Sequence, residues 1–281
     1  MTMDFNAKFS AEFFPPRDPK DDDALLAGVK KIAEHKPRYL SVTYGPAGLW
    51  ADRTAGLARR IREETGIETA AHMTCIGQKK DILFKQLDMY ATQGIKHIVA
   101  LRGDMPRDKE KPALDDTNYF HYANEFVEGI KAHNPDFDIS VGAYPETHRE
   151  AATEAEDLRY LKQKIDAGAR RAVTQFFFET DIFAKFLERA QSAGIDCEIV
   201  AGLSAINDFE RICRYAKGAK AHMPDTLIKQ FADPHQDHLS LAAVFLENQI
   251  ETLIQGGARH FHFYTLNTAE PLIRVLEKLE G

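Results

Sequence analysis

The sequence has no block of basic residues and no apolar run of membrane-spanning length. Its 36 basic and 43 acidic side chains leave a net charge of -7, so we expect no nucleic-acid partner. A membrane-spanning helix needs about 20 consecutive apolar residues, so none is expected. The first ten residues, MTMDFNAKFS, also lack the apolar core of a signal peptide.

Cysteine is scarce. Cys75, Cys197 and Cys213 are widely spaced and odd in number, which argues against a disulfide framework and against a zinc-binding spacing. A hydrophobic content of 44% is ordinary for a globular enzyme. Together with the missing signal peptide, these features lead us to expect a protein of the reducing cytoplasm.

Short β-rich segments alternate with amphipathic stretches along the whole chain. The segments are residues 8–14, 39–44, 68–74, 97–102, 138–144, 171–178, 197–202 and 260–265. Alternation of strands and helices indicates a parallel sheet, and eight such units suit an α/β fold of the (β/α)8 TIM-barrel type, with residues 1–281 as a single domain. A doubly wound open sheet is the alternative, but no G-x-G-x-x-G follows the first strand. Residues 203–259 are longer than one loop and one helix need, and we expect two or three helices there before the last strand.

The helical stretches carry their own signals. Leu25, Val29 and Ile32 recur at spacings of three and four residues after a run of aspartates, as in an amphipathic helix. Gly66 follows another such stretch and is expected to end that helix.

Polar residues stand at the ends of nearly all the predicted strands. They are Glu12, Thr43, Tyr44, His72, Arg102, Gly103, Asp104, Tyr144, Glu146, His148, Gln175, Tyr264 and Thr265. A single carboxylate or histidine at a strand end is more often a surface residue. In a barrel, however, all eight strands end at the face that carries the active site, so these side chains are expected to converge there.

Several of these segments resemble one enzyme family. SAEFFPPR, SVTYG, AHMTC, IVALRGD, DISVGAYPETH, DAGARRAVTQFFF and HFHFYTLN are similar, in the same order, to the flavin-dependent methylenetetrahydrofolate reductases, specifically the bacterial catalytic form. The resemblance implies a (β/α)8 barrel that binds FAD. It also implies hydride transfer from NADH or NADPH through FAD to 5,10-methylenetetrahydrofolate, and a homodimer or homotetramer.

The resemblance implies roles for individual residues. Glu12 is expected to be the general acid, and Asp104 the carboxylate near pterin and flavin. The residues expected to contact FAD are Thr43, His72, Arg102, Gly103, Asp104, Ala123, Tyr144, His148, Asp157 and Lys164. The residues expected to bind folate or nicotinamide are Glu12, Asp104, Gln175, Arg211, Tyr215 and Thr268.

Several positions depart from the family pattern, and AGLSAINDF lacks the proline that is usual after the glycine of the seventh strand. Tyr160 and Gln163 stand where an asparagine and a basic residue are usual beside FAD. Arg211 stands in place of a common glutamine, and Thr268 in place of an arginine. These departures concern the FAD diphosphate and the folate tail, while the residues of the expected chemistry are present.

The chemistry itself explains why a carboxylate is expected at Glu12. Opening the five-membered ring of methylenetetrahydrofolate requires a proton on the leaving amine, N10, and hence a general acid. A carboxylic acid serves at neutral pH if apolar surroundings raise its pKa. Phe13, Phe14, Pro15 and Pro16 are expected to provide those surroundings.

Two other classes of function compete with a flavin-dependent reductase. One is a different enzyme on the same barrel, such as a flavin-free folate reductase or a proline-oxidising relative. The other is a non-catalytic folate-binding protein, which would not need the acid at Glu12. No metal is expected, because His260 and His262, two apart on a strand, are more often packed side chains than ligands, and His235 and His238 lack partnering residues.

Overall fold

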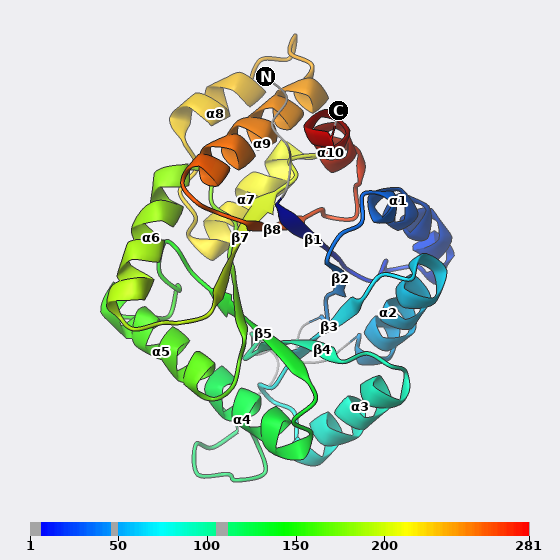
Figure 1. The fold of residues 1–281 in the computed structure, drawn as a ribbon, viewed down its shortest axis with the longest axis vertical. Coiled ribbons are helices and arrows are strands. Elements are labelled where there is room, and N and C mark those ends of the chain that lie inside the picture. Colours follow the sequence, from blue (N-terminus) through cyan, green and yellow to red (C-terminus); the bar gives the residue numbers. More distant parts are fainter. Residues whose placement is uncertain (1–6, 46–49, 105–111, 281) are drawn as a thin grey trace.

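Eight parallel strands close into a barrel surrounded by helices, as the sequence predicts (Figure 1). The computed structural model describes residues 7–45, 50–104 and 112–280. Residues 1–6 of MTMDFNAKFS, the segment that lacks the apolar core of a signal peptide, therefore lie outside the described residues. The strands are β1 Lys8–Phe13, β2 Tyr39–Val42, β3 Thr69–Thr74, β4 His97–Leu101, β5 Asp138–Ala143, β6 Arg171–Thr174, β7 Glu198–Ser204 and β8 His260–Tyr264.

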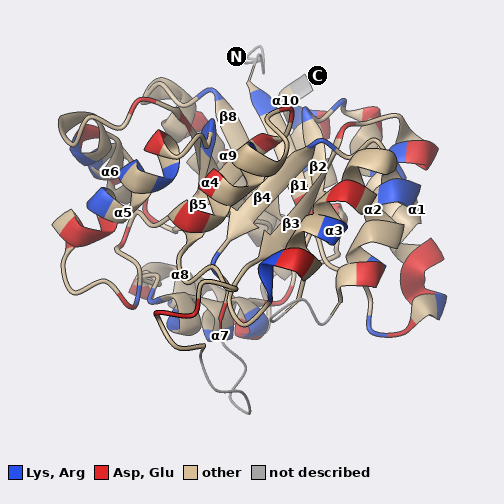
Figure 2. Cartoon of the chain, turned by 90° about the horizontal axis from the view of Figure 1, so that it is seen from below, with Lys and Arg blue, Asp and Glu red and all other residues tan. Residues whose placement is uncertain are grey.

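A helix follows each strand in the barrel. The helices are η1 Pro19–Asp21, α1 Asp22–Glu34, α2 Ala51–Thr65, α3 Lys80–Thr92, α4 Ala123–His133, α5 Glu154–Asp166, α6 Thr180–Ser192, α7 Phe209–Ala219, α8 Asp225–Phe231, α9 His238–Gln255 and α10 Glu270–Glu280. The three helices α7, α8 and α9 lie between β7 and β8, which confirms the extra helices predicted there. Viewed from the side, α7 and α8 lie across one end of the barrel (Figure 2).

Alternation along the strands separates an apolar outer layer from a polar interior. On β1, Phe9, Ala11 and Phe13 belong to the main apolar core, which they share with the buried face of α1. Ser10 and Glu12 alternate with them and point into the barrel, where they contact β8 side chains. The predicted positions Leu25, Val29 and Ile32 are buried, and Gly66 ends α2 in the left-handed conformation with φ of 72°.

The sixth strand is shorter than predicted. It ends at Thr174, whereas the apolar run suggested a strand over residues 171–178. Phe176 and Phe178 pack in a second apolar cluster with α7, α8 and α9, while Phe177 joins the main core. Tertiary packing, and not strand pairing, therefore accounts for their apolar character.

Candidate active site

Glu12 lies inside the open end of the barrel, one residue before the end of β1. Its side chain is 19% exposed, and its Oε2 lies 3.5 Å from Nε2 of His72 and 3.6 Å from Nε2 of His262. The strand register explains the arrangement: Glu12 pairs with Tyr264 of β8, and Ser10 pairs with His262. The structure thus brings the predicted Glu12 and His72 together and adds His262, which was set aside as a packed strand histidine.

The prediction that apolar surroundings raise the pKa of Glu12 is wrong. Phe13 is fully buried on the opposite face of the strand, so it cannot shield the carboxylate. Burial raises the pKa of Glu12, but electrostatic attraction to His72 and a hydrogen bond from His262 outweigh burial and lower the pKa overall. Burial lowers the pKa of His72 to about 4, so this imidazole is neutral at neutral pH. Glu12 is therefore a carboxylate among imidazoles at rest, and not an acid in an apolar pocket.

The segment after β8 fixes the end of β1 from the side. Thr265 Oγ1 donates to the carbonyl oxygen of Glu12 at 2.7 Å. The Asn267 side chain accepts from the backbone N–H of Phe14 at 2.9 Å and donates to the Phe14 carbonyl at 2.8 Å. Asn267 adopts φ of 65°, a conformation that asparagine tolerates better than most residues. This clamp was not predicted for Asn267, although its place in YTLN at a strand end offered a signal.

A second group gathers beside β5 and α5 and brings together four of the predicted FAD contacts. The Lys164 ammonium donates to the Gly142 carbonyl at 2.5 Å and lies 6.0 Å from the centre of the Tyr144 ring. The Tyr144 ring meets the His148 ring at 4.5 Å, and the His148 backbone N–H donates to Asp157 at 2.9 Å. Burial lowers the pKa of Lys164 to about 8, partly opposed by the charge of Asp157.

Arg102 and Asp104 lie at the rim and have partners that were not predicted. Arg102 pairs with Glu150 at 2.7 Å. Asp104, with a side chain 67% exposed, pairs with Arg149 at 2.5 Å. Asp104 is therefore an exposed rim carboxylate, in contrast to the enclosed Glu12.

Helix α7 brings two predicted substrate-binding residues over the end of β1. Arg211 lies 5.3 Å from the ring centre of Phe14 and 5.5 Å from that of Tyr215. The Arg211 Nε also donates to Tyr215 Oη at 3.2 Å. Tyr215 is an exposed aromatic residue. Arg211 and Tyr215 thus form one surface beside Phe14, the residue that follows β1.

The remaining predicted residues lie at strand ends or helix starts. Thr43 follows β2 and donates its N–H to Phe13 at 2.9 Å, while Gln175 follows β6 and donates its N–H to Ala143 at 2.8 Å. The Gln175 side chain accepts from the N–H of Phe176 at 3.0 Å. Ala123 is the first residue of α4, and Thr268 lies between β8 and α10.

The residues present fit an FAD molecule. The Thr74 hydroxyl is buried and has no hydrogen-bond partner among the described residues, so it is available to a ligand. Gly103 faces Thr74 with φ of 81°, and a Cβ at this position would lie 2.6 Å from Thr74 Cβ. Only glycine therefore allows the backbone at position 103 to lie this close to the Thr74 side chain. The cations Arg102 and Lys164 are suited to a diphosphate. Tyr160, one of the residues that differ from the family pattern, donates its hydroxyl hydrogen to the Glu156 carboxylate at 2.9 Å.

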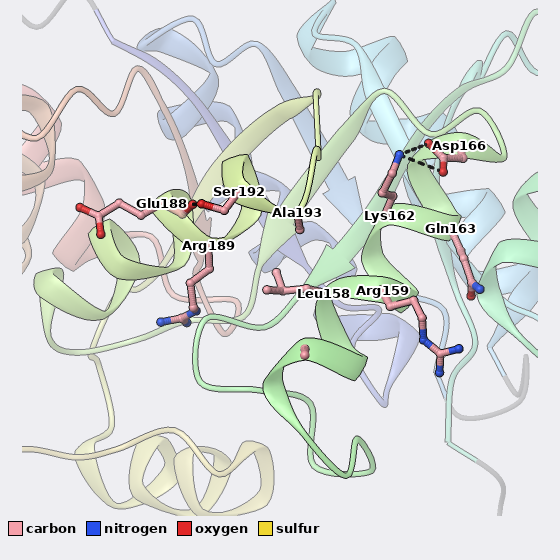
Figure 3. Close-up of a pocket in the computed structure, with 10 residues that line it drawn as sticks. Leu158, Arg159, Lys162, Gln163, Asp166, Glu188, Arg189, Ser192 and Ala193 are labelled. Atoms are coloured by element: carbon pink, nitrogen blue, oxygen red, sulfur yellow. Dashed lines mark hydrogen bonds and ion pairs between the residues drawn. The ribbon is translucent and has the colours of Figure 1, made fainter.

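One groove on the described surface lies away from the barrel mouth. It measures about 770 Å³ and runs between α5 and α6 on the outside of the barrel (Figure 3). Two of its cations are already paired, Lys162 with Asp166 at 2.8 Å and Arg189 with Glu154 at 3.1 Å. We place the site at the barrel mouth, because the clustered titratable groups lie there.

The buried histidines predict loss of stability in acid. Burial lowers the pKa of His260 from its ordinary value of 6.5 to about 4, so the folded state favours the neutral ring. Its contribution is complete above pH 6.5 and is lost as the pH falls toward 4. At about 1.4 kcal/mol per pKa unit, we expect His260 to account for about 2 kcal/mol of the stability lost between pH 7 and pH 5.

Denaturant titrations of the wild type and of His260→Asn at both pH values would test this expectation. The variant should lose less stability than the wild type over this range. Equal losses in the two proteins would contradict it.

Three comparisons with known proteins bear on the site. The family model for methylenetetrahydrofolate reductase matches residues 2–280. The chain is 39% identical over 265 residues to the 5,10-methylenetetrahydrofolate reductase of Pectobacterium carotovorum, covering 93% of this chain and 86% of that one. The Escherichia coli enzyme of the same name is also 39% identical, over 264 residues and the same shares.

A solved structure shares the fold. It is an uncharacterized protein from Clostridium thermocellum that binds two copies of 5-methyl-5,6,7,8-tetrahydrofolic acid. It superposes with a TM-score of 0.64 at 11% identity, covering 98% of this chain and 94% of the other. In the part of the chain described here, no helix combines the length and apolar character needed to cross a bilayer.

Proposed function

The chain belongs to the methylenetetrahydrofolate reductase family, and from that membership we propose that it is an FAD-dependent enzyme. It interconverts 5,10-methylenetetrahydrofolate and 5-methyltetrahydrofolate, with NADH or NADPH as the other substrate. Nicotinamide and folate alternate at one site, which gives ping-pong kinetics. The observation that carries the proposal is the Glu12 carboxylate, enclosed with two imidazoles at the floor of the barrel mouth.

The cations and polar groups of the mouth hold the cofactor in this proposal. Lys164 and Arg102 meet the diphosphate, and Thr74 and the close backbone at Gly103 meet the flavin portion. Thr43, His72, Ala123, Tyr144, His148 and Asp157 complete the surface. Bound FAD supplies the hydride-transfer chemistry.

The side chains of the mouth position folate and move one proton. Tyr215 stacks on the flat ring of either substrate, next to Arg211. Asp104 leaves Arg149 and accepts the adjacent N–H groups of the pterin, which a carboxylate orients well. Gln175 provides a second pterin contact, and Thr268 lies toward the folate tail. Glu12 donates a proton to N10 as the bond from N10 to the methylene carbon breaks and a hydride joins that carbon.

Two features of the cell context follow from the proposal. The three free thiols suit a reducing compartment, so we place the protein in the cytoplasm. By analogy with the family, it is a homodimer or homotetramer.

A visible spectrum of the purified protein tests the proposal. We expect a flavin band that NADH or NADPH bleaches without oxygen and that 5,10-methylenetetrahydrofolate then restores. Denaturation should release FAD. A protein that binds folate but never carries flavin would support the flavin-free or non-catalytic alternative.

A pair of lysine variants tests the cofactor site. Lys164→Gln removes a half-buried cation of α5, and hydrogen bonds to charged groups contribute about 1.5–3 kcal/mol, so FAD affinity should fall by about 10- to 100-fold. Lys162→Gln removes a cation of the same helix that faces the outer groove, has a side chain 42% exposed and pairs with Asp166, and it should leave FAD affinity unchanged. Flavin fluorescence during dilution measures both, and equal affinities would place the diphosphate elsewhere.

A further inference from the structure

We propose that a hydrogen-bonding path through the barrel interior delivers protons to Glu12 from the opposite end of the barrel. The path runs, in order, through Glu198, His260, Ser10 and His262. It rests on the proposed function, because it supplies the proton that folate reduction consumes.

The lower half of the proton path begins at solvent. Glu198 is the first residue of β7, at the N-terminal end of the barrel, and its side chain is 33% exposed. Its Oε1 lies 3.1 Å from Nδ1 of His260. The other ring nitrogen of His260, Nε2, lies 3.4 Å from the Ser10 hydroxyl.

The upper half connects Ser10 with the active site. The Ser10 hydroxyl lies 2.8 Å from Nδ1 of His262, whose Nε2 lies 3.6 Å from Glu12 Oε2. A small rotation of the carboxylate closes this last step. Because Ser10 pairs with His262 and Glu12 with Tyr264, the parallel register of β1 and β8 stacks these groups along the barrel axis.

The surroundings suit proton transfer. Ser10, His260 and His262 are at most 3% exposed, so bulk water does not compete for their hydrogen bonds. The Tyr39 ring lies 5.9 Å from His260 and 6.0 Å from His262, and it holds both rings in place. The lowered pKa of His260 keeps that ring neutral, with one nitrogen that carries hydrogen and one that accepts it.

Charged groups surround the entrance. Arg38 pairs with Glu198 at 2.5 Å and lies 3.4 Å from His260 Nδ1, and Arg171 pairs with Glu198 Oε2 at 3.2 Å. Burial raises the pKa of Glu198, but its interactions with His260 and then with Arg38 outweigh burial, so the pKa is lowered overall. Glu198 is therefore ionised at rest, and its partly exposed side chain can take up a proton from water and pass it on.

One proton crosses the path in each turnover. The ionised Glu12 takes a proton from His262 Nε2 and gives it to N10, while His262 Nδ1 takes the hydroxyl proton of Ser10. Ser10 is refilled from His260 Nε2, and His260 Nδ1 from Glu198, which takes a proton from water. Ser10 regains the hydrogen it gave, and the two rings end in the other tautomer. After the product leaves, a proton from water at the open mouth enters through Glu12 and leaves through Glu198, and these reverse transfers restore both tautomers. Oxidation of methyltetrahydrofolate runs the same transfers backward.

The path solves a problem of access. In the proposed function, cofactor and folate cover Glu12 from the mouth, the side on which it is exposed. Its lowered pKa leaves it ionised at rest, so a proton must arrive after folate binds. The interior route stays open in that complex.

Ser10→Ala tests the proton path, because it interrupts the chain without changing Glu12 or either imidazole. A positioned acid contributes about 10²–10⁴-fold, and we expect loss of its proton supply to slow folate-dependent flavin reoxidation by about 10-fold. Flavin reduction by NADH should stay within about 2-fold of wild type, because it needs no proton at N10. Ser10→Thr, which keeps the hydroxyl, should restore the folate rate.

Ser41→Ala is the matched control. Ser41 is a fully buried serine on the neighbouring strand β2, opposite Glu12 in register, and its hydroxyl has no partner among the described residues. It should leave both half-reactions unchanged. If Ser10→Ala and Ser41→Ala behave alike, or if Ser10→Ala slows both half-reactions equally, the proposal is overturned. Wild-type protein without folate-dependent reoxidation would instead refute the proposed function.

A second readout does not depend on flavin. In flavin-free protein, the nitrogen NMR shifts of His260 and His262 report which ring nitrogen carries hydrogen. Ser10→Ala should change the tautomer ratio of both rings, and Ser41→Ala should change neither. Unchanged ratios in Ser10→Ala would show that the hydroxyl does not link the two rings and would overturn the path.

Discussion

Replacing Glu12 with glutamine should separate the two halves of the reaction. The amide keeps the size and hydrogen-bonding capacity of the carboxylate but cannot donate a proton to N10. Reduction of the flavin by NADH should stay within about one order of magnitude of wild type, since it needs no such donor. Folate reduction should fall by about 10²–10⁴-fold, the usual contribution of a positioned general acid. Stopped-flow absorbance at the flavin band measures each half.

Glu12→Asp serves as the control for this variant. It retains a titratable carboxyl group but shortens its reach, so its folate rate should lie between those of wild type and Glu12→Gln. Equal slowing of both halves in Glu12→Gln would mean that Glu12 shapes the site. If neither half-reaction slowed, another residue would have to be the general acid, and Asp104 would be the next residue to test.

The two imidazoles sharpen this expectation. His72 and His262 lie within 3.6 Å of Glu12 and lower its pKa, so the resting enzyme holds a carboxylate. An acid with a raised pKa would begin the folate half-reaction already protonated, whereas this carboxylate must gain a proton before it can donate one. The folate half-reaction of the wild type therefore depends on proton supply as well as on geometry.

The position of Glu12 was predictable, but its environment was not. Strand alternation and the barrel rule placed Glu12 at the site, because both depend on local sequence and parallel topology. The neighbours of the carboxylate depend on the register between β1 and β8, which are 250 residues apart in the chain at Ser10 and His260. Phe13, although adjacent in sequence, points to the other face of the strand and belongs to the apolar core, so it says nothing about the surroundings of the Glu12 carboxylate.

The same reasoning explains the other differences. The end of β6 at Thr174 was missed because strand pairing and burial under α7 to α9 give the same apolar pattern. The partners of Arg102 and Asp104, Glu150 and Arg149, come from the loop after β5, whose course depends on tertiary contacts. The number of strands and the extra helices before β8 were predictable, because each unit carries its own periodicity.

Gly202 should be the glycine of the barrel wall least tolerant of a side chain. A Cβ at this position in β7 would lie 2.0 Å from the Thr174 carbonyl oxygen and 2.9 Å from Cε2 of Tyr264. The first contact is with the backbone of β6, which cannot rotate away. Tyr264 is held as well, because its hydroxyl donates to the same Thr174 carbonyl at 2.8 Å.

We therefore expect Gly202→Ala to lower the free energy of unfolding by about 3 kcal/mol, the upper part of the usual range for overpacked cores. Gly56→Ala is the control: Gly56 lies inside α2, where a Cβ would meet nothing within 4 Å, and alanine should stabilise that helix by about 0.5–1 kcal/mol. Urea titrations followed by circular dichroism would measure both changes. A Gly202→Ala protein as stable as wild type would mean that β6 and β7 can separate at Thr174 without loss. Since Gln175 follows Thr174 directly, a displaced β6 should also weaken folate binding in this variant.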